Sequence, residues 1–267
     1  MPEGDTVFRT ARLLDRSLSG RVLSRTDFRV PQLATSDLSG GTVVETVSRG
    51  KHLLTRVDGP TGSGERWTLH THLKMEGAWR VHEPGQRWTR PAHQARVVLE
   101  TDAAVAVGFS LGVVELLPRD DEDRAVGHLG PDLLGPDWDE HEALRRLHED
   151  PDLPVGVALL DQRRLAGIGT LYRAETLFLT GVNPYLAVHE VPDLRKVVDL
   201  ARRLLLANTE RAAQITTGNL RRGEQHWVFE RSGRPCRRCG TRISSGTQGP
   251  PGRERLSYWC PACQPSL

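Results

Sequence analysis

Aromatic residues and lysines are scarce in this chain, and cysteine is absent before Cys236. Aromatic side chains make up 5% of the 267 residues, and only Lys51, Lys74 and Lys196 are lysines among 36 basic Lys and Arg residues. No apolar run is long enough to span a bilayer, and no basic segment followed by an apolar one opens the chain. We therefore expect a cytoplasmic protein without a membrane partner.

The length and composition are those of a globular protein with more than one domain. The chain has 37% hydrophobic residues, which is enough for ordinary cores, and its 26 glycines and 17 prolines indicate many turns. At 267 residues, two or three domains are expected.

Positive charge gathers at the C-terminal end. The net charge of the whole chain is +2, but residues 218–267 contain nine arginines against three glutamates and no aspartate. A basic module on a near-neutral body indicates a polyanion partner such as nucleic acid. A solvated basic tail is the alternative on charge alone.

The four cysteines form two close pairs with the pattern C-x2-C-x20-C-x2-C. They are Cys236, Cys239, Cys260 and Cys263. Two such pairs separated by a hairpin-sized loop can place four thiolates tetrahedrally around one Zn²⁺. Four sulfur ligands leave no open position for a substrate, so we predict a structural zinc that supplies the folding energy of a small module.

Glycines and prolines at residues 249–252 predict a turn between the cysteine pairs. The returning strand would carry Arg255, followed by Tyr258 and Trp259. A two-stranded ribbon that presents arginine can enter a groove of duplex DNA. Taken alone, an arginine at this position is more often a solvated strand residue.

The rest of the chain changes from strand-like to helix-like texture. Val7, Ala11, Leu14 and Leu18 predict a short helix capped by Asp5 or Thr6. Short β runs over residues 20–117 predict an antiparallel β-sandwich. The charge-rich stretch 117–124 predicts a boundary, and helices are expected over residues 137–148, 155–160 and 192–213. The fold class is α+β.

Several residues of the body have both a structural and a functional interpretation. Gly167 and Gly169 predict a tight turn before a helix whose amides can bind a phosphate, or an ordinary corner between helices. Lys51 follows a glycine at the start of a strand, where surface lysines are common. Met75, between Lys74 and Glu76 at a strand-to-turn corner, is either core or an apolar wedge against DNA.

Six segments occur together in one order and carry a resemblance. They are MPEG, RGKHLL, HLKMEGAW, AGIGTLYRAE, FERSGRPCRRCG and RERLSYWCPACQ. The chain resembles the formamidopyrimidine-DNA glycosylase/endonuclease VIII family of base-excision repair enzymes over nearly its whole length, and its start and MEGAW loop look more like the endonuclease VIII branch.

The resemblance implies a role for each of these residues. After removal of Met1, the Pro2 nitrogen would be the nucleophile that forms an iminium at C1′ of the damaged nucleotide, and an α-amino group near pKa ~8 is partly unprotonated at neutral pH. Glu3 would transfer protons, Lys51 would be catalytic or phosphate-binding, and Met75 would fill the void left by the flipped base. Lys74, Gly167, Gly169, Thr170 and Arg255 would contact DNA.

The resemblance also implies the division into domains and the partners. It gives a catalytic β-sandwich over residues 1–117, a hinge over 118–134, a helix–two-turn–helix domain over 135–225 and a zinc-ribbon hairpin over 226–267. The expected partner is damaged double-stranded DNA, with single-stranded and forked DNA as further candidates. The protein would act as a monomer in the nucleoid.

Three departures from the family pattern keep two functions open. Asp5 and Thr6 stand where the family has Pro and Glu, Thr170 stands where it has Asn, and a retained Met1 would block the amine. The first function is a bifunctional glycosylase and abasic-site lyase that acts on oxidised pyrimidines, with an 8-oxoguanine enzyme as a variant. The second is a damage-binding paralogue with little or no catalysis.

Overall fold

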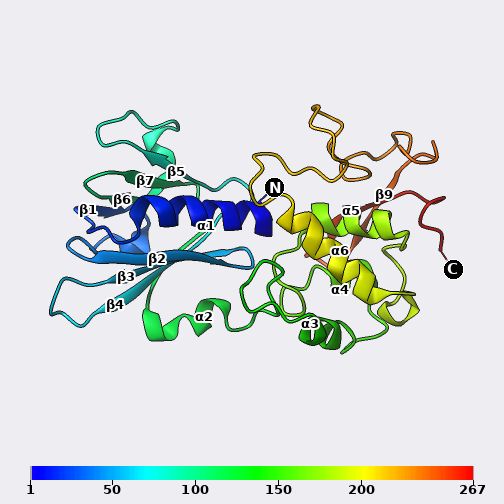
Figure 1. Ribbon diagram of the computed structural model, residues 1–267, viewed down its shortest axis with the longest axis horizontal. Coiled ribbons are helices and arrows are strands. Elements are labelled where there is room, and N and C mark those ends of the chain that lie inside the picture. Colours follow the sequence, from blue (N-terminus) through cyan, green and yellow to red (C-terminus); the bar gives the residue numbers. More distant parts are fainter. Residues whose placement is uncertain (1, 267) are drawn as a thin grey trace. The chain divides into compact units, whose positions relative to one another are not determined.

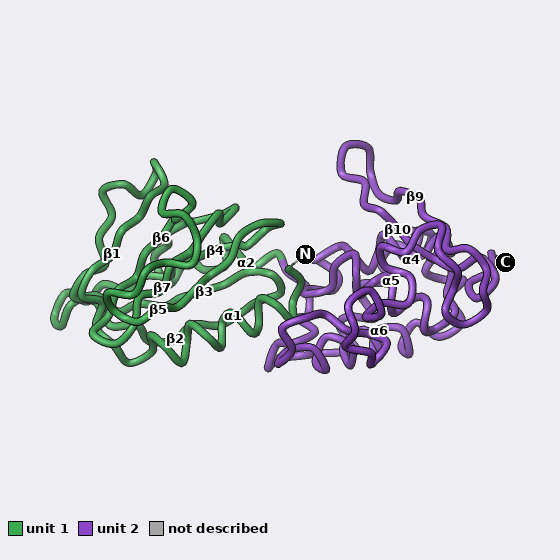
Figure 2. Tube along the Cα trace, turned by 90° about the horizontal axis from the view of Figure 1, so that it is seen from above, with its two compact units in different colours: residues 1–128 green, residues 129–267 purple. Residues whose placement is uncertain are grey.

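The computed structural model describes residues 2–266, so Met1 and Leu267, and with them the question of Met1 removal, lie outside the described residues. The chain divides into two compact units, unit 1 with residues 1–128 and unit 2 with residues 129–267 (Figure 2). The boundary falls inside the predicted hinge at 118–134. The finer division into four parts stays a prediction.

Unit 1 begins with helix α1 (Gly4–Leu18), and the predicted apolar stripe of Val7, Ala11, Leu14 and Leu18 is its buried face. The prediction that Asp5 or Thr6 caps the helix is wrong. Glu3 occupies the N-cap position in extended conformation, and no side chain caps the helix. Helical geometry already begins at Gly4, so Asp5 and Thr6 lie inside the first turn.

Two antiparallel four-stranded sheets follow, and the predicted β-sandwich is confirmed. In one sheet the strand order is β1 (Arg25–Phe28), β6 (Ala95–Glu100), β7 (Val105–Phe109), β5 (Ala78–His82). In the other the order is β2 (Thr42–Arg49), β3 (His52–Asp58), β4 (Arg66–His72), β8 (Val113–Pro118). Strand β4 ends at His72, so Met75 lies in the connection that follows the strand.

The core of unit 1 lies between the two sheets and α1. Apolar residues from all three form one buried cluster, which includes Leu14, Leu18, Leu53, Leu69, Val97, Leu99 and Val114. Figure 1 shows α1 running along the strands of both sheets. The helix therefore closes the sandwich, and burial of its apolar face fixes where its N-terminal end lies in unit 1.

The predicted break at residues 117–124 is anchored to the sandwich. It contains the 3-10 turn η3 (Arg119–Asp121), and the short helix α2 (Asp123–Val126) follows. Arg56 of β3 forms a two-pronged ion pair with Glu122, with N–O distances of 2.8 and 2.7 Å, and Thr68 of β4 donates to the same carboxylate at 2.5 Å. The carboxylate of Glu122 therefore ties this charged segment to strands β3 and β4.

Unit 2 is helical at first, and its helices are shorter than predicted. They are α3 (Glu140–Leu147), α4 (Val155–Ala158), α5 (Thr170–Thr180) and α6 (Leu194–Leu206). Asp139 caps α3 by accepting from the amide of Glu142 at 3.0 Å. The stretch expected to be helical up to residue 213 ends at Leu206, because the buried amide of Asn208 bonds the Leu204 and Ile215 carbonyls and turns the chain.

The cysteine segment of unit 2 contains a hairpin of β9 (Ser244–Gln248) and β10 (Arg255–Trp259). Its turn uses Gly249 and Gly252, both with positive φ, as the sequence predicted. The hairpin projects from the helices of unit 2 in Figure 2. The α+β fold is confirmed, and within residues 2–266 no helix is long and apolar enough to cross a membrane.

Candidate active site and metal centre

The predicted nucleophile and proton-transfer residue lie at the N-terminal end of α1. Pro2 is half-buried, and the Glu3 residue is 1% exposed. The Glu3 carbonyl accepts from the amide of Val7 at 3.1 Å, which fixes the backbone of this corner. Pro2 therefore precedes, along the chain, a buried carboxyl group at a helix N-terminus, where negative charge is favoured.

Asp5 supplies a second buried carboxylate one residue earlier than the family pattern places it. Its side chain lies in the first turn of α1 and the residue has no exposed surface. Thr6, which follows it, is half-buried, and its carbonyl accepts from the Thr10 hydroxyl at 2.8 Å. An acidic group is therefore present in this turn although Thr6 cannot supply it.

Lys51 lies in the two-residue turn between β2 and β3, one position before the strand that the sequence predicted it to start. Arg49 and His52 pair across the turn, and Gly50 takes a φ of +58° that favours glycine. The lysine is half-buried. A tight hairpin turn holds its backbone in one place.

Lys74 and Met75 lie in the connection between β4 and β5. Lys74 has a φ of +51°, and its amide donates to Nδ1 of His72 at 2.9 Å. Met75 is 66% exposed, so it is not a core residue. The exposed thioether at a fixed turn is the geometry that an apolar wedge requires, and this role stays a prediction.

Sequence reasoning missed a histidine cluster beside these lysines. His52 and His70 stack with ring centroids 5.0 Å apart, and His52 meets His72 edge-on at 4.9 Å. His70 is buried, and Glu115 of β8 accepts from its Nδ1 at 2.9 Å. The sequence did contain a signal for this cluster. The histidines of the segment HTH alternate along a strand, and the histidine of KH follows a turn, so that all three rings can lie on one face of the sheet.

In unit 2, the glycine turn leads into α5 as predicted. Gly167 has a φ of +101°, and Gly169 is the N-cap residue of α5, with Thr170 as its first helical residue. Gln162 braces the turn, because its side chain accepts from the Gly167 amide at 3.1 Å and donates to the Ile168 carbonyl at 3.0 Å. Thr170 is 8% exposed. The conformation of the turn is therefore held by hydrogen bonds within the protein.

Arg255 is the first residue of β10 and is exposed, opposite Gln248. The next residue, Leu256, is tied to α5, because the guanidinium of the fully buried Arg173 donates to its carbonyl and to that of Gly156. The strand that carries Arg255 and the helix that begins at Thr170 are thus connected through one buried cation.

Glu175 is a further residue whose role the sequence did not reveal. Its buried carboxylate accepts from three consecutive backbone amides, those of Trp227 at 2.8 Å, Val228 at 2.8 Å and Phe229 at 2.9 Å. It thereby holds the segment that leads into the first cysteine pair against α5. A glutamate on the apolar face of a helix was the available signal.

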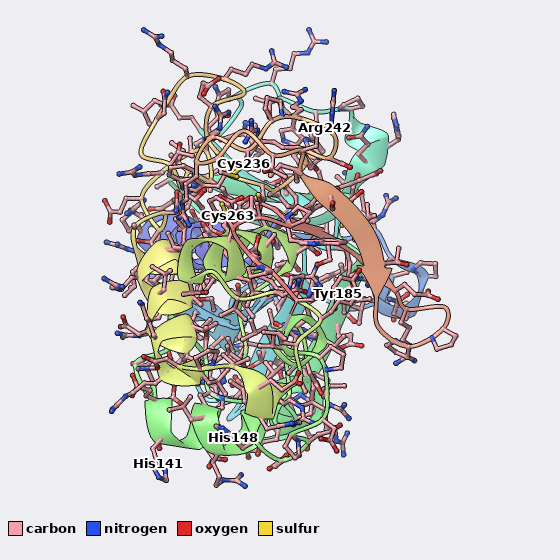
Figure 3. The ribbon with its side chains drawn as sticks, turned by 90° about the vertical axis from the view of Figure 1, so that its right-hand side faces the viewer. His141, His148, Tyr185, Cys236, Arg242 and Cys263 are labelled. Atoms are coloured by element: carbon pink, nitrogen blue, oxygen red, sulfur yellow. The ribbon has the colours of Figure 1, made fainter. Side chains whose placement is uncertain are left out.

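The four cysteines meet as the spacing predicted. Their sulfur atoms all lie within 4.8 Å of one another, with Sγ–Sγ distances of 3.5 Å for Cys239–Cys260, 3.5 Å for Cys239–Cys263 and 4.0 Å for Cys236–Cys263. All four are free thiols. Tetrahedral thiolates around zinc at about 2.3 Å stand about 3.8 Å apart, so the donor set fits such an ion. Figure 3 shows Cys236 and Cys263 in this part of unit 2.

Comparison with known proteins gives matches over nearly the whole chain. Residues 1–110 match the model of the formamidopyrimidine-DNA glycosylase N-terminal domain. The chain is 54% identical to a probable endonuclease 8 2 of Streptomyces coelicolor, over 99% of this chain and 94% of that one. It is 49% identical to the DNA-(apurinic or apyrimidinic site) lyase Nei2 of Mycolicibacterium smegmatis, over 99% of both chains.

A more distant relative and a solved structure extend the comparison. The chain is 31% identical to endonuclease 8 of Escherichia coli, over 99% of this chain and 100% of that one. The Fpg protein of Lactococcus lactis, solved in complex with DNA containing an abasic site, aligns with a TM-score of 0.79 at 20% identity, over 99% of this chain and 100% of that one. The structural likeness shows that the two chains share a fold.

Proposed function

The chain belongs to the formamidopyrimidine-DNA glycosylase/endonuclease VIII family, on its endonuclease VIII side, and from that premise we propose that it is a bifunctional DNA glycosylase and abasic-site lyase. The observation that carries the proposal is the N-terminal corner of unit 1. Pro2, which removal of Met1 would make N-terminal, directly precedes the buried Glu3 in a chain that matches an abasic-site lyase over 99% of its length.

The chemistry follows from a secondary amine and a carboxyl group. The Pro2 nitrogen attacks C1′ of the damaged nucleotide, the base leaves, and an iminium forms that serves as an electron sink for strand cleavage by elimination. Glu3 transfers protons at the sugar oxygen and the base. Lys51 neutralises a phosphate or assists the amine. Pro2, Glu3 and Lys51 all belong to unit 1.

Binding is assigned to groups of both units. Met75 fills the space of the flipped nucleotide and Lys74 contacts DNA, while Gly167, Gly169 and Thr170 present amides to a phosphate at the start of α5. Arg255 contacts the backbone from the hairpin. The partner is damaged duplex DNA, with single-stranded and forked DNA as further substrates to compare, and the protein acts as a monomer in the nucleoid.

We further propose that the metal is one structural Zn²⁺, held by Cys236, Cys239, Cys260 and Cys263. Thiolate ligands at these distances suit zinc, and a closed set of four leaves the ion without a catalytic position. When bound, the ion supplies folding energy to the hairpin and takes no part in the reaction.

A cleavage panel tests the function. Duplexes that each carry one lesion, an oxidised pyrimidine, an 8-oxoguanine or an abasic site, are incubated with the protein, and strand cleavage is followed under single turnover. The proposal predicts cleavage at the abasic site and at pyrimidine lesions. Preferential cleavage at 8-oxoguanine would change the assigned substrate from oxidised pyrimidines to 8-oxoguanine. Tight binding without cleavage of any duplex would favour the damage-binding paralogue.

A further inference from the structure

The histidine cluster lies on the face of a sheet that points away from the sandwich core. The register pairs His52 with His72, and His70 with Glu115. Side chains alternate between faces along a strand, and the residues next to these in sequence are core residues, Leu53, Leu69 and Val114. The three histidines and Glu115 therefore share the outer face, at the end of the sheet where the Lys51 turn lies.

A hydrogen-bond chain crosses this face and links His52 to Glu115 through His70. A carboxylate only accepts, so Nδ1 of His70 carries the proton that it donates to Glu115 at 2.9 Å. With a single proton on His70, its Nε2 accepts, and Nδ1 of His52 donates to it at 2.8 Å. In that arrangement Nε2 of His52 is the nitrogen without a proton and can take one up.

The charged and titratable groups near His52 come from several parts of unit 1. Lys51 and Lys74 lie in the turns before and after the strands, Arg49 of β2 pairs with His52 in register, and Glu115 stands behind His70. The ring of His128 lies 6.1 Å from that of His52. His72 accepts the Lys74 amide at Nδ1, so its own proton is on Nε2. The cluster is rich in cations, and its carboxylate lies two hydrogen bonds from His52.

These surroundings keep the rings of His52 and His72 neutral in the free protein. Burial, followed by the nearby imidazoles and Lys74, lowers the pKa of His52 to about 3. Burial, followed by the ammonium groups of Lys74 and Lys51, lowers the pKa of His72 to about 4. An anion bound beside the lysines would reverse the sign of the charge contribution and raise both pKa values.

We propose that His52 is a proton-linked phosphate-binding residue, which takes up a solvent proton at Nε2 when a DNA phosphate binds beside Lys51 and Lys74. His70 and Glu115 are positioning residues that stabilise the imidazolium through their hydrogen-bond chain. One N–H bond forms and no bond of the DNA breaks. The inference rests on the proposed function only in taking the anion to be a DNA phosphate.

The sign of the linkage follows from the two states. His52 binds its proton more tightly in the complex than in the free protein, so binding takes up protons and the affinity rises as pH falls through the pKa of the complex. For one linked proton the affinity changes by at most about tenfold per pH unit. The gain begins as pH falls through the pKa of the complex, is complete only below the pKa of the free protein, and is absent well above the pKa of the complex.

Proton counting by calorimetry tests the proposal directly. The full-length protein is titrated with duplex carrying a stable abasic analogue at pH 6.0 and pH 7.5, in buffers of different ionisation heat. We expect net proton uptake at pH 6.0 that disappears in His52→Asn. His141→Asn is the matched control, because that histidine points into solvent from α3 of unit 2 (Figure 3) and its loss should leave the uptake unchanged.

Glu115→Gln is the second variant, because Glu115 is about half exposed and its replacement leaves the core intact. It keeps a hydrogen-bond acceptor and removes the charge, so uptake should fall without vanishing. ¹⁵N-histidine spectra of the free protein should show His52 protonated at Nδ1 and bare at Nε2. Binding with unchanged uptake in His52→Asn, or the opposite tautomer, would overturn this inference alone. Absence of binding at both pH values would overturn it together with the proposed function.

Discussion

Two regions of the molecule are held in place by different means. One is the N-terminal corner of unit 1, which consists of Pro2, Glu3 and the first turn of α1. The other is the cysteine hairpin of unit 2, residues 236–263. The corner rests on a helix whose apolar face is part of a large core. In the hairpin, the buried hydrophobic residues are Cys236, Ile243 and Cys260. The corner should therefore keep its structure without any ion, while under the zinc proposal the hairpin should need its four metal ligands to fold.

The comparison also separates the residues proposed for catalysis from residues proposed for DNA binding. The groups proposed to react lie in unit 1, whereas the glycine turn, Thr170 and Arg255 lie in unit 2 and offer donors for phosphate. Changes in the corner should alter reaction rates at constant affinity, and changes in unit 2 should alter affinity. Each prediction below can break that division.

Loss of the metal should have the largest effect. Structural zinc contributes about 10–16 kcal/mol to the folding of small modules, so Cys260→Ser or chelation should unfold the hairpin and weaken DNA binding by more than about 100-fold. Limited proteolysis should then cut within 236–263 and spare the sandwich. Stoichiometric zinc is expected in the purified protein by elemental analysis, and a metal-free protein with a protected hairpin would refute the assignment.

Glu3→Gln comes next and concerns only the corner. Removal of a proton-transfer group costs about 10²–10⁴ in rate, so excision of a damaged base should slow by that factor in single-turnover assays. Cleavage at a pre-formed abasic site should suffer less, because excision has already occurred. Affinity for the abasic analogue should stay within about twofold. A loss of affinity as large as the loss of rate would show that Glu3 is structural.

Arg255→Ala should weaken binding without slowing the bound reaction. A lost hydrogen bond from a charged donor costs about 1–3 kcal/mol, which corresponds to a rise in Kd of about 5- to 150-fold at fixed salt. Arg253→Ala is the matched control, because Arg253 lies exposed in the turn of the same hairpin. This substitution removes the same charge as Arg255→Ala. Equal losses in the two variants would reduce Arg255 to one of many surface charges.

Thr170→Val should have the smallest effect. The replacement keeps the shape of a residue that is 8% exposed and removes only its hydroxyl. We expect a loss of about 0.5–1.5 kcal/mol in DNA affinity and a nearly unchanged melting temperature. Wild-type affinity would mean that the amides of the glycine turn bind phosphate without help from the hydroxyl.

The same contrast explains what the sequence could predict. Cysteine spacing reports metal geometry directly, so the cluster of Cys236, Cys239, Cys260 and Cys263 follows from the chain alone. Period-two and helical patterns likewise predicted the sandwich and α1. Pro2 and Glu3 carry no such spacing, and only the resemblance to a family marked them.

Residues whose roles depend on distant partners were beyond sequence reasoning. Glu175 has its role because the chain returns to α5 at residues 227–229, whose three amides donate to its carboxylate. His70 has its role because β8 places Glu115 opposite it. The early end of α6 has the same cause, since Asn208 bonds a carbonyl seven residues later. Local propensity contains none of these contacts.

Borohydride trapping with peptide mapping tests the central claim, that Pro2 is the nucleophile. The protein is incubated with abasic-site DNA and the reductant, and the attached residue is identified by mass spectrometry. The account predicts DNA on the Pro2 nitrogen, and no trapping when one uncleavable residue precedes Pro2, because the nitrogen is then an amide. DNA attached to Lys51, or trapping that survives the blocked N-terminus, would contradict it.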